Sequence, residues 1–340
     1  MTTRRLPAVA FSLLTSVFLI AGIMTSPAHA SPTPNTQGDD QPVSTNAPEL
    51  HSSSSSTQEI DTAGYWTEER MRSAIPAEEL IEEAASKAYQ SNVPQSIERS
   101  GELGVTGDSS YPVYPKPTPG LPTQNAVVPA TTGKVFFTYK GKNYVCSGSV
   151  INGVTKNVVS TAGHCVHGGK GEGWHGNIAF APGYHNGVST YGLWNWKTAH
   201  TFQGWTNSSD FSRDQAFFTV YPRNGRTLVD TVGGNGLSYN YGHNQTGVRI
   251  WGWPAESPFN GGIPYYCDGS TRKQSFLSED MVMPCNMTGG ASGGPWLRSR
   301  IDENLGYVFG VTSRRTTSRE KLLISTPFDD AVNNLFQGIK

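Results

Sequence analysis

Thr288-Gly289-Gly290-Ala291-Ser292-Gly293-Gly294-Pro295-Trp296 places one serine among four glycines, just before a proline and a tryptophan. Glycine accepts positive φ and lets another molecule approach main-chain N–H groups closely. A serine held in such a loop exposes its hydroxyl, with the N–H groups of Gly290 and Ser292 aimed at one point. That arrangement suits acyl transfer, because the nucleophile then lies about 3 Å from donors for a developing oxyanion. A glycine-rich surface turn that contains a serine is the alternative, since so short a pattern has little specificity.

A second motif lies upstream of the serine loop. Thr161-Ala162-Gly163-His164-Cys165 follows an expected strand, and Cys146 lies in the strand before it. Serine is a weak nucleophile at its own pKa, so a base must take its proton, and histidine titrates near neutral pH. His164 is therefore the candidate base for Ser292. A His-Cys pair by itself would instead favour a structural histidine.

Together the two motifs resemble those of the trypsin-fold serine peptidases, whose histidine motif is Thr-Ala-Ala/Gly-His-Cys. The serine loop is similar to Thr-Gly-Gly-x-Ser-Gly-Ser/Gly-Pro in the secreted bacterial branch that includes glutamyl endopeptidases. The resemblance extends from about residue 130 to residue 340. It implies an all-β fold of two antiparallel barrels with the active site between them. It also implies a His-Asp-Ser triad, an oxyanion hole from the Gly290 and Ser292 N–H groups, protein or peptide substrates, and no metal or organic cofactor.

The third triad member must orient the imidazole and stabilise its charged form. The acidic residues between His164 and Ser292 are Glu172, Asp210, Asp214, Asp230, Glu256, Asp268, Glu279 and Asp280. The family carries this residue as Asp-x-Ala before an apolar strand, which Asp214-Gln215-Ala216-Phe217-Phe218 matches. Asp210 competes but lacks the small residue two positions later, so the resemblance favours Asp214. The order His, Asp, Ser differs from the Ser, Asp, His order of α/β-hydrolases, and excludes that architecture.

Two departures concern activation and specificity. Ala291 stands where the digestive members have an aspartate that receives a new N-terminal ammonium, so that switch is not expected. Asn286 stands six residues before Ser292, where a lysine or arginine reader would have aspartate, which argues against trypsin-like specificity. The glutamyl branch has a histidine where this chain runs Gly310-Val311-Thr312-Ser313-Arg314. Thr312 or Arg314 could bind a substrate carboxylate instead, although we favour a solvated surface charge for Arg314.

The cysteines are Cys146, Cys165, Cys267 and Cys285. An even number in an exported protein indicates disulfides. Of the three connectivities, we favour Cys146–Cys165 and Cys267–Cys285, because each closes a short loop worth roughly 3 kcal/mol. A zinc site using His164, Cys165 and His167 would have no recognised ligand spacing.

The N-terminal third is expected to be removed in stages. Residues 1–30 combine Arg4-Arg5, a mostly apolar run and Ala28-His29-Ala30, which predicts a cleaved signal peptide rather than a membrane anchor. No later run approaches about 18 apolar residues, so a soluble, secreted protein without membrane contact is expected. Residues 31–125 are interpreted as a pro-segment, itself a partner of the enzyme that shields the cleft or assists folding. A secreted low-complexity tether is the alternative.

Within that segment, residues 31–64 are predicted to be disordered because they contain few large apolar groups. Residues 67–71 and 76–90 are predicted helices. Glu78, Glu79, Glu82 and Glu83 lie in the first turns of the second, favourably for its dipole. Residues 112–122 read as a stiff proline-rich linker.

The body, residues 126–340, reads as many short strands and one C-terminal helix. The expected strands are 135–139, 144–151, 157–162, 247–253, 270–277, 295–298 and 307–312. Thr326 is the expected cap of the helix and Pro327 its first residue. Phe328, Val332, Leu335 and Phe336 form its apolar stripe.

Net charge is -1, which gives no electrostatic case for nucleic acid or an anionic membrane. Two further classes of function remain as alternatives: a carbohydrate-binding β-domain that stacks tryptophans on sugars, and a catalytically inactive relative that binds. The relevant tryptophans are Trp174, Trp194, Trp196, Trp205, Trp251 and Trp253. Such residues more often pack in a core.

Overall fold

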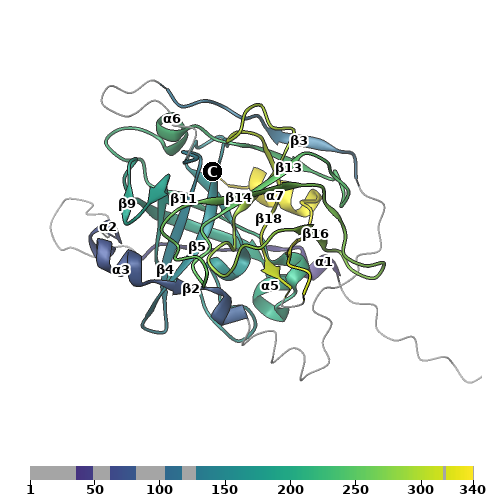
Figure 1. Cartoon of the computed structure of the whole chain (residues 1–340), viewed down its shortest axis with the longest axis horizontal. Helices are drawn as coiled ribbons and strands as arrows, with labels where there is room; N and C mark the ends of the chain where they lie inside the picture. Colours follow the sequence, from purple (N-terminus) through teal and green to yellow (C-terminus); the bar gives the residue numbers. More distant parts are fainter. Residues whose placement is uncertain (1–35, 49–61, 82–103, 117–127, 317–318, 340) are drawn as a thin grey trace, which may run out of the picture. The chain divides into compact units, whose positions relative to one another are not determined.

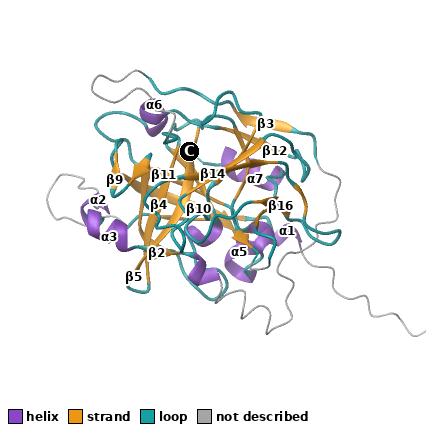
Figure 2. Ribbon diagram, viewed as in Figure 1, coloured by secondary structure: helices purple, strands orange, loops and turns teal. Residues whose placement is uncertain are grey.

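The structure is a computed structural model of the chain, and it describes residues 36–48, 62–81, 104–116, 128–316 and 319–339. Strands dominate the part from residue 128 onward, and short helices lie around them (Figures 1 and 2). The strands form two β-barrels of the chymotrypsin-like type, which confirms the fold class expected from the sequence. The predicted signal peptide lies outside the described residues.

The first barrel closes through six strands in the order β10-β11-β6-β5-β4-β7, with β7 pairing back onto β10. Alternate residues such as Val135 and Phe137 on β4, and Phe218 on β11, point into a fully buried core. A two-residue turn, Lys140-Gly141, joins β4 to β5 with positive φ at both positions, as a tight hairpin requires. The strands are β4 Thr132–Tyr139, β5 Lys142–Ile151, β6 Val158–Thr161, β7 Gly176–Pro182, β10 Trp194–Phe202 and β11 Ala216–Val220.

The second half contains two sheets, ordered β14-β13-β17-β18-β12, which β3 Gly107–Ser110 of the N-terminal segment extends, and β15-β16-β20-β19. Their shared core is apolar and includes Ile250, Met281, Trp296 and Phe309. The strands are β12 Gly236–Tyr239, β13 Val248–Gly252, β14 Tyr265–Gly269, β15 Arg272–Lys273, β16 Met281–Pro284, β17 Pro295–Arg298, β18 Tyr307–Val311, β19 Arg314–Arg315 and β20 Leu322–Ser325.

Short elements connect the strands. Between β7 and β10 lies the hairpin β8 Tyr184–His185 with β9 Val188–Ser189. The helices are η1 Gly163–Cys165, α5 Gln203–Ser208, η2 Phe211–Arg213, α6 Leu228–Val232 and α7 Asp330–Gln337.

The strand predicted at 270–277 is wrong over most of its length. Only Arg272–Lys273 pairs there, while Phe276 and Leu277 are 85% and 69% exposed. The apolar residues of this run lie on a surface loop. The longer strands that flank the run in the sequence are β14 and β16.

The N-terminal segment adds strands to the barrels. β1 Pro42–Asn46 pairs antiparallel with β10, β2 Ile75–Pro76 pairs parallel with β5, and β3 Gly107–Ser110 pairs antiparallel with β12. The helices of this segment are α1 Thr36–Asp39, α2 Thr62–Tyr65 and α3 Glu68–Ser73.

The disorder expected for 31–64 is therefore wrong at residues 36–46, because β10 supplies an edge onto which a polar segment can hydrogen-bond through its backbone. The helix expected at 76–90 begins later: Pro76 lies in β2 and residues 78–81 are helical. Its remainder, and residues 117–122 of the expected linker, lie outside the described residues.

The C-terminal helix α7 is present, but it begins at Asp330 rather than at the expected Pro327. Asp329 is the N-cap, and its carboxylate accepts the Val332 N–H at 3.1 Å. Thr326 does not cap the helix because its hydroxyl lies within 3.2 Å of Asp280 Oδ1. The Phe328 N–H donates to the Phe309 carbonyl, so the chain still runs beside β18 at that point. The apolar stripe is buried as expected.

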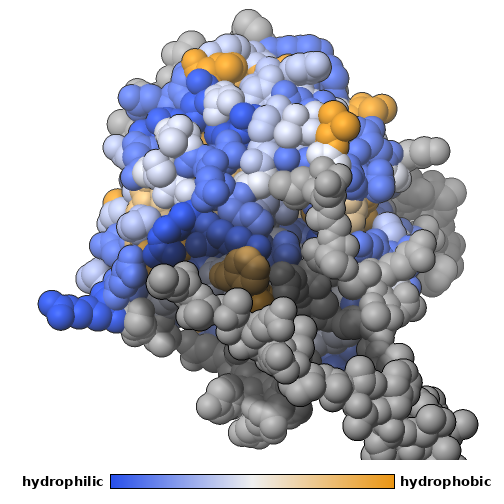
Figure 3. Space-filling view, turned by 90° about the vertical axis from the view of Figure 1, so that its right-hand side faces the viewer, coloured by the Kyte–Doolittle hydropathy of each residue, from blue (hydrophilic) through white to orange (hydrophobic). Residues whose placement is uncertain are grey.

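One face of the described part is mainly polar. Figure 3 shows one face on which hydrophilic residues dominate and apolar ones form small separate groups. Within the described ranges, no helix has the length and apolar character needed to cross a bilayer.

Candidate active site

His164 and Asp214 are brought together at the end of the first barrel. His164 lies in η1, directly after β6, and Asp214 directly precedes β11, which pairs with β6. The ring atom Nδ1 lies 2.9 Å from Asp214 Oδ2, and the His164 backbone N–H donates to Asp214 Oδ1 at 2.8 Å. A carboxylate in this position accepts a hydrogen bond from Nδ1–H, so Nε2 carries the lone pair. Asp214 therefore fixes both the ring and its tautomer.

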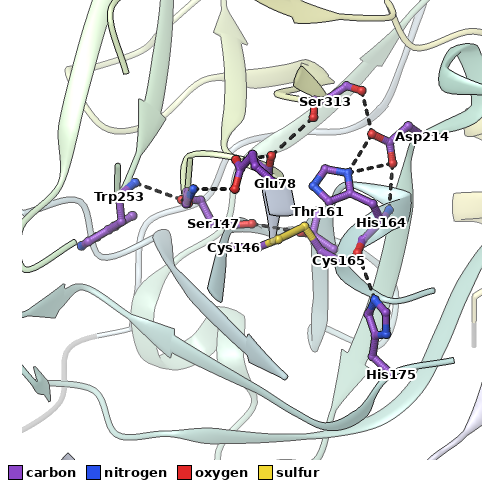
Figure 4. Close-up of a disulfide and its surroundings, with 12 residues drawn as sticks. Glu78, Cys146, Ser147, Thr161, His164, Cys165, His175, Asp214, Trp253 and Ser313 are labelled. Carbon is purple, nitrogen blue, oxygen red and sulfur yellow. Dashed lines mark hydrogen bonds and ion pairs between the residues drawn. A yellow bond between two sulfur atoms is a disulfide. The ribbon is translucent and has the colours of Figure 1, made fainter. Parts of the chain in front are cut away.

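Ser313 completes the surroundings of the Asp214 carboxylate. Its hydroxyl donates to Asp214 Oδ2 at 2.6 Å (Figure 4). Asp214 is only 1% exposed, and three donors surround it: the backbone and ring N–H groups of His164 and the Ser313 hydroxyl. With its oxygens satisfied by these donors, the carboxylate is held in one position, where it can stabilise an imidazolium beside it.

Asp210, the competing acid, is used otherwise. Its carboxylate caps η2 by accepting the Ser212 N–H at 2.9 Å, and both its oxygens accept the Ser212 hydroxyl at 2.8 Å. The geometry thus places Asp214, and not Asp210, against the His164 ring.

His175 supports His164 from behind. Its Nε2 lies 3.0 Å from the His164 carbonyl oxygen, and its ring stacks on Phe137 with a 4.3 Å centroid separation. Burial lowers the pKa of His175 to about 3, so the ring is neutral and Nε2–H can donate to that carbonyl. The sequence analysis did not single out this residue.

The serine loop packs so closely against neighbouring segments that two of its positions have no room for a side chain. Gly290 and Gly293 have φ of +96° and +79°. A Cβ at Gly293 would lie 2.1 Å from Thr161 Oγ1, and one at Gly290 would lie 2.6 Å from the Trp253 carbonyl oxygen. These two positions therefore need glycine, both for the conformation and for the space.

Ser147 on β5 joins the serine loop to the first barrel. Its backbone N–H donates to the Ser292 carbonyl at 2.6 Å, and its hydroxyl donates to the Gly290 carbonyl at 2.8 Å. The same hydroxyl accepts the Trp253 N–H at 3.0 Å. Because Cys146 next to it is bonded to Cys165, one short stretch of β5 positions both the histidine and the serine motifs.

Comparisons with solved structures agree with this fold. The thermostable serine protease AL20 from an extremophilic microorganism is 31% identical, with a TM-score of 0.58 over 61% of this chain and 95% of that one. The protease Anisep from Arthrobacter nicotinovorans is 33% identical, with a TM-score of 0.58 over 62% of this chain and 95% of that one. The chain belongs to the trypsin-fold serine proteases.

A glutamyl endopeptidase shares the fold of this protease. It is 18% identical, with a TM-score of 0.50 over 69% of this chain and 97% of that one. No protein-family model matches the sequence, and a search of curated proteins gives no match.

The two disulfides of the protease join the favoured pairs, Cys146–Cys165 and Cys267–Cys285. The first links β5 to η1, and the second links β14 to the residue after β16. Cys146, His164 and Cys165 lie close enough together to resemble a metal-binding group. Both sulfurs are taken up in the disulfide, however, so neither offers the thiolate that a zinc site would use.

The residues considered for specificity lie differently from expectation. Asn286 is exposed rather than at the base of a buried pocket. The Thr312 hydroxyl accepts the Trp296 indole N–H at 3.0 Å. Arg314 is not the solvated charge that the sequence analysis favoured, because it forms a 2.6 Å ion pair with the buried Asp280 and lies over the Phe211 ring. Sequence position alone does not reveal such partners.

The tryptophans of this protease are mostly core residues. Trp194, Trp196, Trp205, Trp251 and Trp253 are each at most 4% exposed. Side chains buried to this degree have no face free to stack on a sugar. Trp174 is partly exposed and packs edge-on against His167, so the carbohydrate-binding alternative rests on that residue alone.

The structure adds a further residue that no motif predicted. Glu78, from the N-terminal segment, is buried beside the serine loop. Its Oε1 accepts the Ser292 hydroxyl at 2.6 Å and its Oε2 accepts the Gly290 N–H at 2.7 Å (Figure 4). In the sequence Glu78 is one of several glutamates at a predicted helix start, and nothing local distinguishes it.

Proposed function

We propose that this trypsin-fold protease is a secreted serine endopeptidase in which His164, Asp214 and Ser292 form the catalytic triad. The observation that carries the proposal is the paired arrangement of His164 and Asp214 with Ser313 behind them. It supplies an oriented base, in the required tautomer, at the junction with the Ser292 loop. The alternative of an inactive relative that only binds has less support, because the chain carries a candidate residue for each role in acyl transfer.

In this proposal Ser292 Oγ attacks the peptide carbonyl while His164 Nε2 takes its proton. The imidazolium is stabilised by Asp214, which the Ser313 hydroxyl holds in place. The carbonyl oxygen becomes an oxyanion between the N–H groups of Gly290 and Ser292. Collapse transfers the proton from Nε2 to the leaving amine, and water then hydrolyses the acyl-enzyme by the same steps in reverse.

The Gly290 N–H already accommodates a negatively charged oxygen. It donates to a Glu78 carboxylate oxygen at 2.7 Å, a distance typical of charge-assisted hydrogen bonds. This supports Gly290 as one donor of the oxyanion hole, since such donors must suit an anion rather than a neutral carbonyl.

For specificity, we propose that the protease does not prefer lysine or arginine. A preference for acidic residues needs a cation, and Arg314 is committed to Asp280. Arg315 on β19 is the alternative: it pairs with Glu256 at 2.5 Å, and a Cβ at Gly289 would lie 2.1 Å from the other Glu256 oxygen. An acidic substrate side chain could replace Glu256 beside the serine loop. Digestion of a peptide library by the wild type and by Arg315→Ala tests this, and an unchanged preference would contradict it.

The function itself is tested by labelling the secreted, processed protein with a fluorophosphonate probe and sequencing the labelled peptide. We expect the label on Ser292 and none in Ser292→Ala. His164→Ala should slow turnover of fluorescent casein by roughly 10⁴-fold. Folded, processed protein that takes up no label would contradict the proposal.

A further inference from the structure

The N-terminal segment crosses the candidate active site as an ordered strap, residues 62–81. Trp66 anchors its first part: it is 3% exposed, and its indole N–H donates to the Asn177 carbonyl at 2.7 Å. β2 then pairs with β5 beside Val145, and the Ala77 N–H donates to the Val145 carbonyl at 3.1 Å. Ile81 ends the strap by packing in one buried cluster with Trp205 of α5 and Phe211 of η2. The strap is therefore fixed on both sides of Glu78.

Between these anchors Glu78 points into the reaction centre. One carboxylate oxygen accepts a hydrogen bond from the Ser292 hydroxyl at 2.6 Å, and the other accepts one from the Gly290 N–H at 2.7 Å. His164 Nε2, which should accept that proton, is buried and has no hydrogen-bond partner among the described residues. Figure 4 shows the Glu78 side chain beside His164, Asp214 and Ser313.

We propose that Glu78 is an intramolecular inhibitor that blocks the proposed serine endopeptidase site with its carboxylate. The inference rests on the function proposed above and names its regulation. The carboxylate acts on two parts of the machinery at once: it holds the serine proton away from His164, and it fills an oxyanion-hole position with an oxygen that is already charged. A substrate carbonyl cannot enter until Glu78 leaves.

The strap also escapes cleavage for a chemical reason. The group that meets Ser292 is a side-chain carboxylate, which is a poor acyl electrophile because its negative charge opposes nucleophilic attack. The strap's backbone hydrogen-bonds instead to β5, at Val145. Ser292 therefore meets an anion, and no bond needs to form or break for inhibition.

Glu79 provides a matched control. It has the same side chain and lies next to Glu78, but it is exposed, whereas Glu78 is 7% exposed. Replacing Glu79 changes the net charge of the strap by the same amount without touching the serine loop.

The experiment measures the rate of fluorophosphonate labelling of the uncut full-length chain. Wild type, Glu78→Ala, Glu78→Gln, Glu79→Ala and Ser292→Ala are compared at equal concentration, with the thermal unfolding midpoint recorded for each. We expect wild type and Glu79→Ala to label slowly. Glu78→Ala should label about 10- to 100-fold faster, the factor that corresponds to the net loss of one charge-assisted hydrogen bond. Glu78→Gln should fall between, because its amide oxygen still accepts the Gly290 N–H.

The outcomes separate the two proposals. Equal, measurable rates for wild type, Glu78→Ala and Glu79→Ala would overturn the Glu78 inhibitor while leaving the serine nucleophile in place. An equal acceleration in Glu79→Ala would also overturn it, since loosening of the strap by any lost charge would then explain the effect. No labelling of any folded variant, including Glu78→Ala, would overturn the proposed function itself.

Discussion

At the residue scale, the sequence identifies the residues proposed to carry the chemistry but misses those that position them. The motifs that contain His164, Ser292 and Asp214 have residue types and spacings that few other protein families share. Ser313 and His175 act through a single hydroxyl and a single N–H, at 2.6 Å and 3.0 Å from their partners. Such roles depend on which distant segments of the chain meet, and the sequence does not reveal this. Glu78 is missed for the same reason, because it lies 214 residues from its partner Ser292.

Asp214 should be needed for turnover rather than for folding alone. In Asp214→Asn, the amide nitrogen can face His164 Nδ1 and favour the tautomer in which Nε2 carries the proton, so the base is lost. We expect turnover of fluorescent casein by the processed enzyme to fall by roughly 10⁴-fold. Asp210→Asn is the matched control: it removes a cap from η2 and should lower the unfolding midpoint with a far smaller loss of turnover. A reversed ranking would assign the third role to Asp210.

His175 makes folding stability depend on pH. Its pKa is about 3 in the folded protein, against about 6.5 when exposed, because burial disfavours the charged ring. The unfolded chain therefore binds more protons between these values. The contribution is fully present above about pH 6.5 and is lost as the pH falls towards 3, by up to roughly 1.4 kcal/mol per pH unit.

The measurement is the unfolding midpoint of wild type and His175→Gln between pH 7.5 and pH 4, using protein without casein or probe. Glutamine can still donate to the His164 carbonyl but does not titrate in this range. We expect the wild-type curve to fall more steeply. His167 and His200, whose pKa values burial lowers to about 4, remain in both proteins and cancel from the comparison. Parallel curves would show that His175 titrates normally.

At the scale of elements, strand prediction succeeds where the strand is buried in the fold and fails where apolar residues lie on a surface loop. β4, β5 and β13 were expected from their β-branched and aromatic runs, and each is largely buried. The error at 270–277 and the misplaced start of α7 share one cause. Local propensity does not register a competing tertiary partner, such as Asp280 for Thr326.

The two disulfides should differ in what their loss does. Cys146–Cys165 ties β5 to the short helix that carries His164, while Cys267–Cys285 ties elements of the second half. Replacing either pair by alanine should lower the free energy of unfolding by roughly 2–5 kcal/mol. Only Cys146→Ala/Cys165→Ala should also slow fluorophosphonate labelling of the processed enzyme, measured well below both unfolding midpoints. Equal loss of labelling in both double variants would contradict this division.

At the scale of the whole molecule, the N-terminal segment contributes far more structure than its composition predicts. It supplies β1 to the edge of β10, β2 to β5 and β3 to β12. Asp40 of this segment also pairs with Arg213, which is 1% exposed and is held on its other side by Asp329. Because Arg213 directly precedes Asp214, the segment touches the chain next to the triad as well as the serine loop. The disorder prediction for this segment relied on its low hydrophobicity. It fails because the segment is held by backbone hydrogen bonds and ion pairs, which do not require apolar side chains.

The blocking role proposed for Glu78 predicts where the N-terminus of active molecules lies. If Glu78 blocks Ser292, wild-type molecules that label readily must have lost contact with the strap, and cleavage must lie C-terminal to Glu78. Culture fluid would be treated with a biotinylated fluorophosphonate, the labelled molecules captured, and their N-termini and native masses determined. We expect wild-type labelled species to lack residues 62–81, both as covalent chain and as bound fragment. In Glu78→Ala, the uncut chain itself should appear among them, because its oxyanion hole is open while the strap remains attached. Wild-type labelled molecules that retain the strap would mean that the enzyme works with Glu78 in place, and the blocking role would fail.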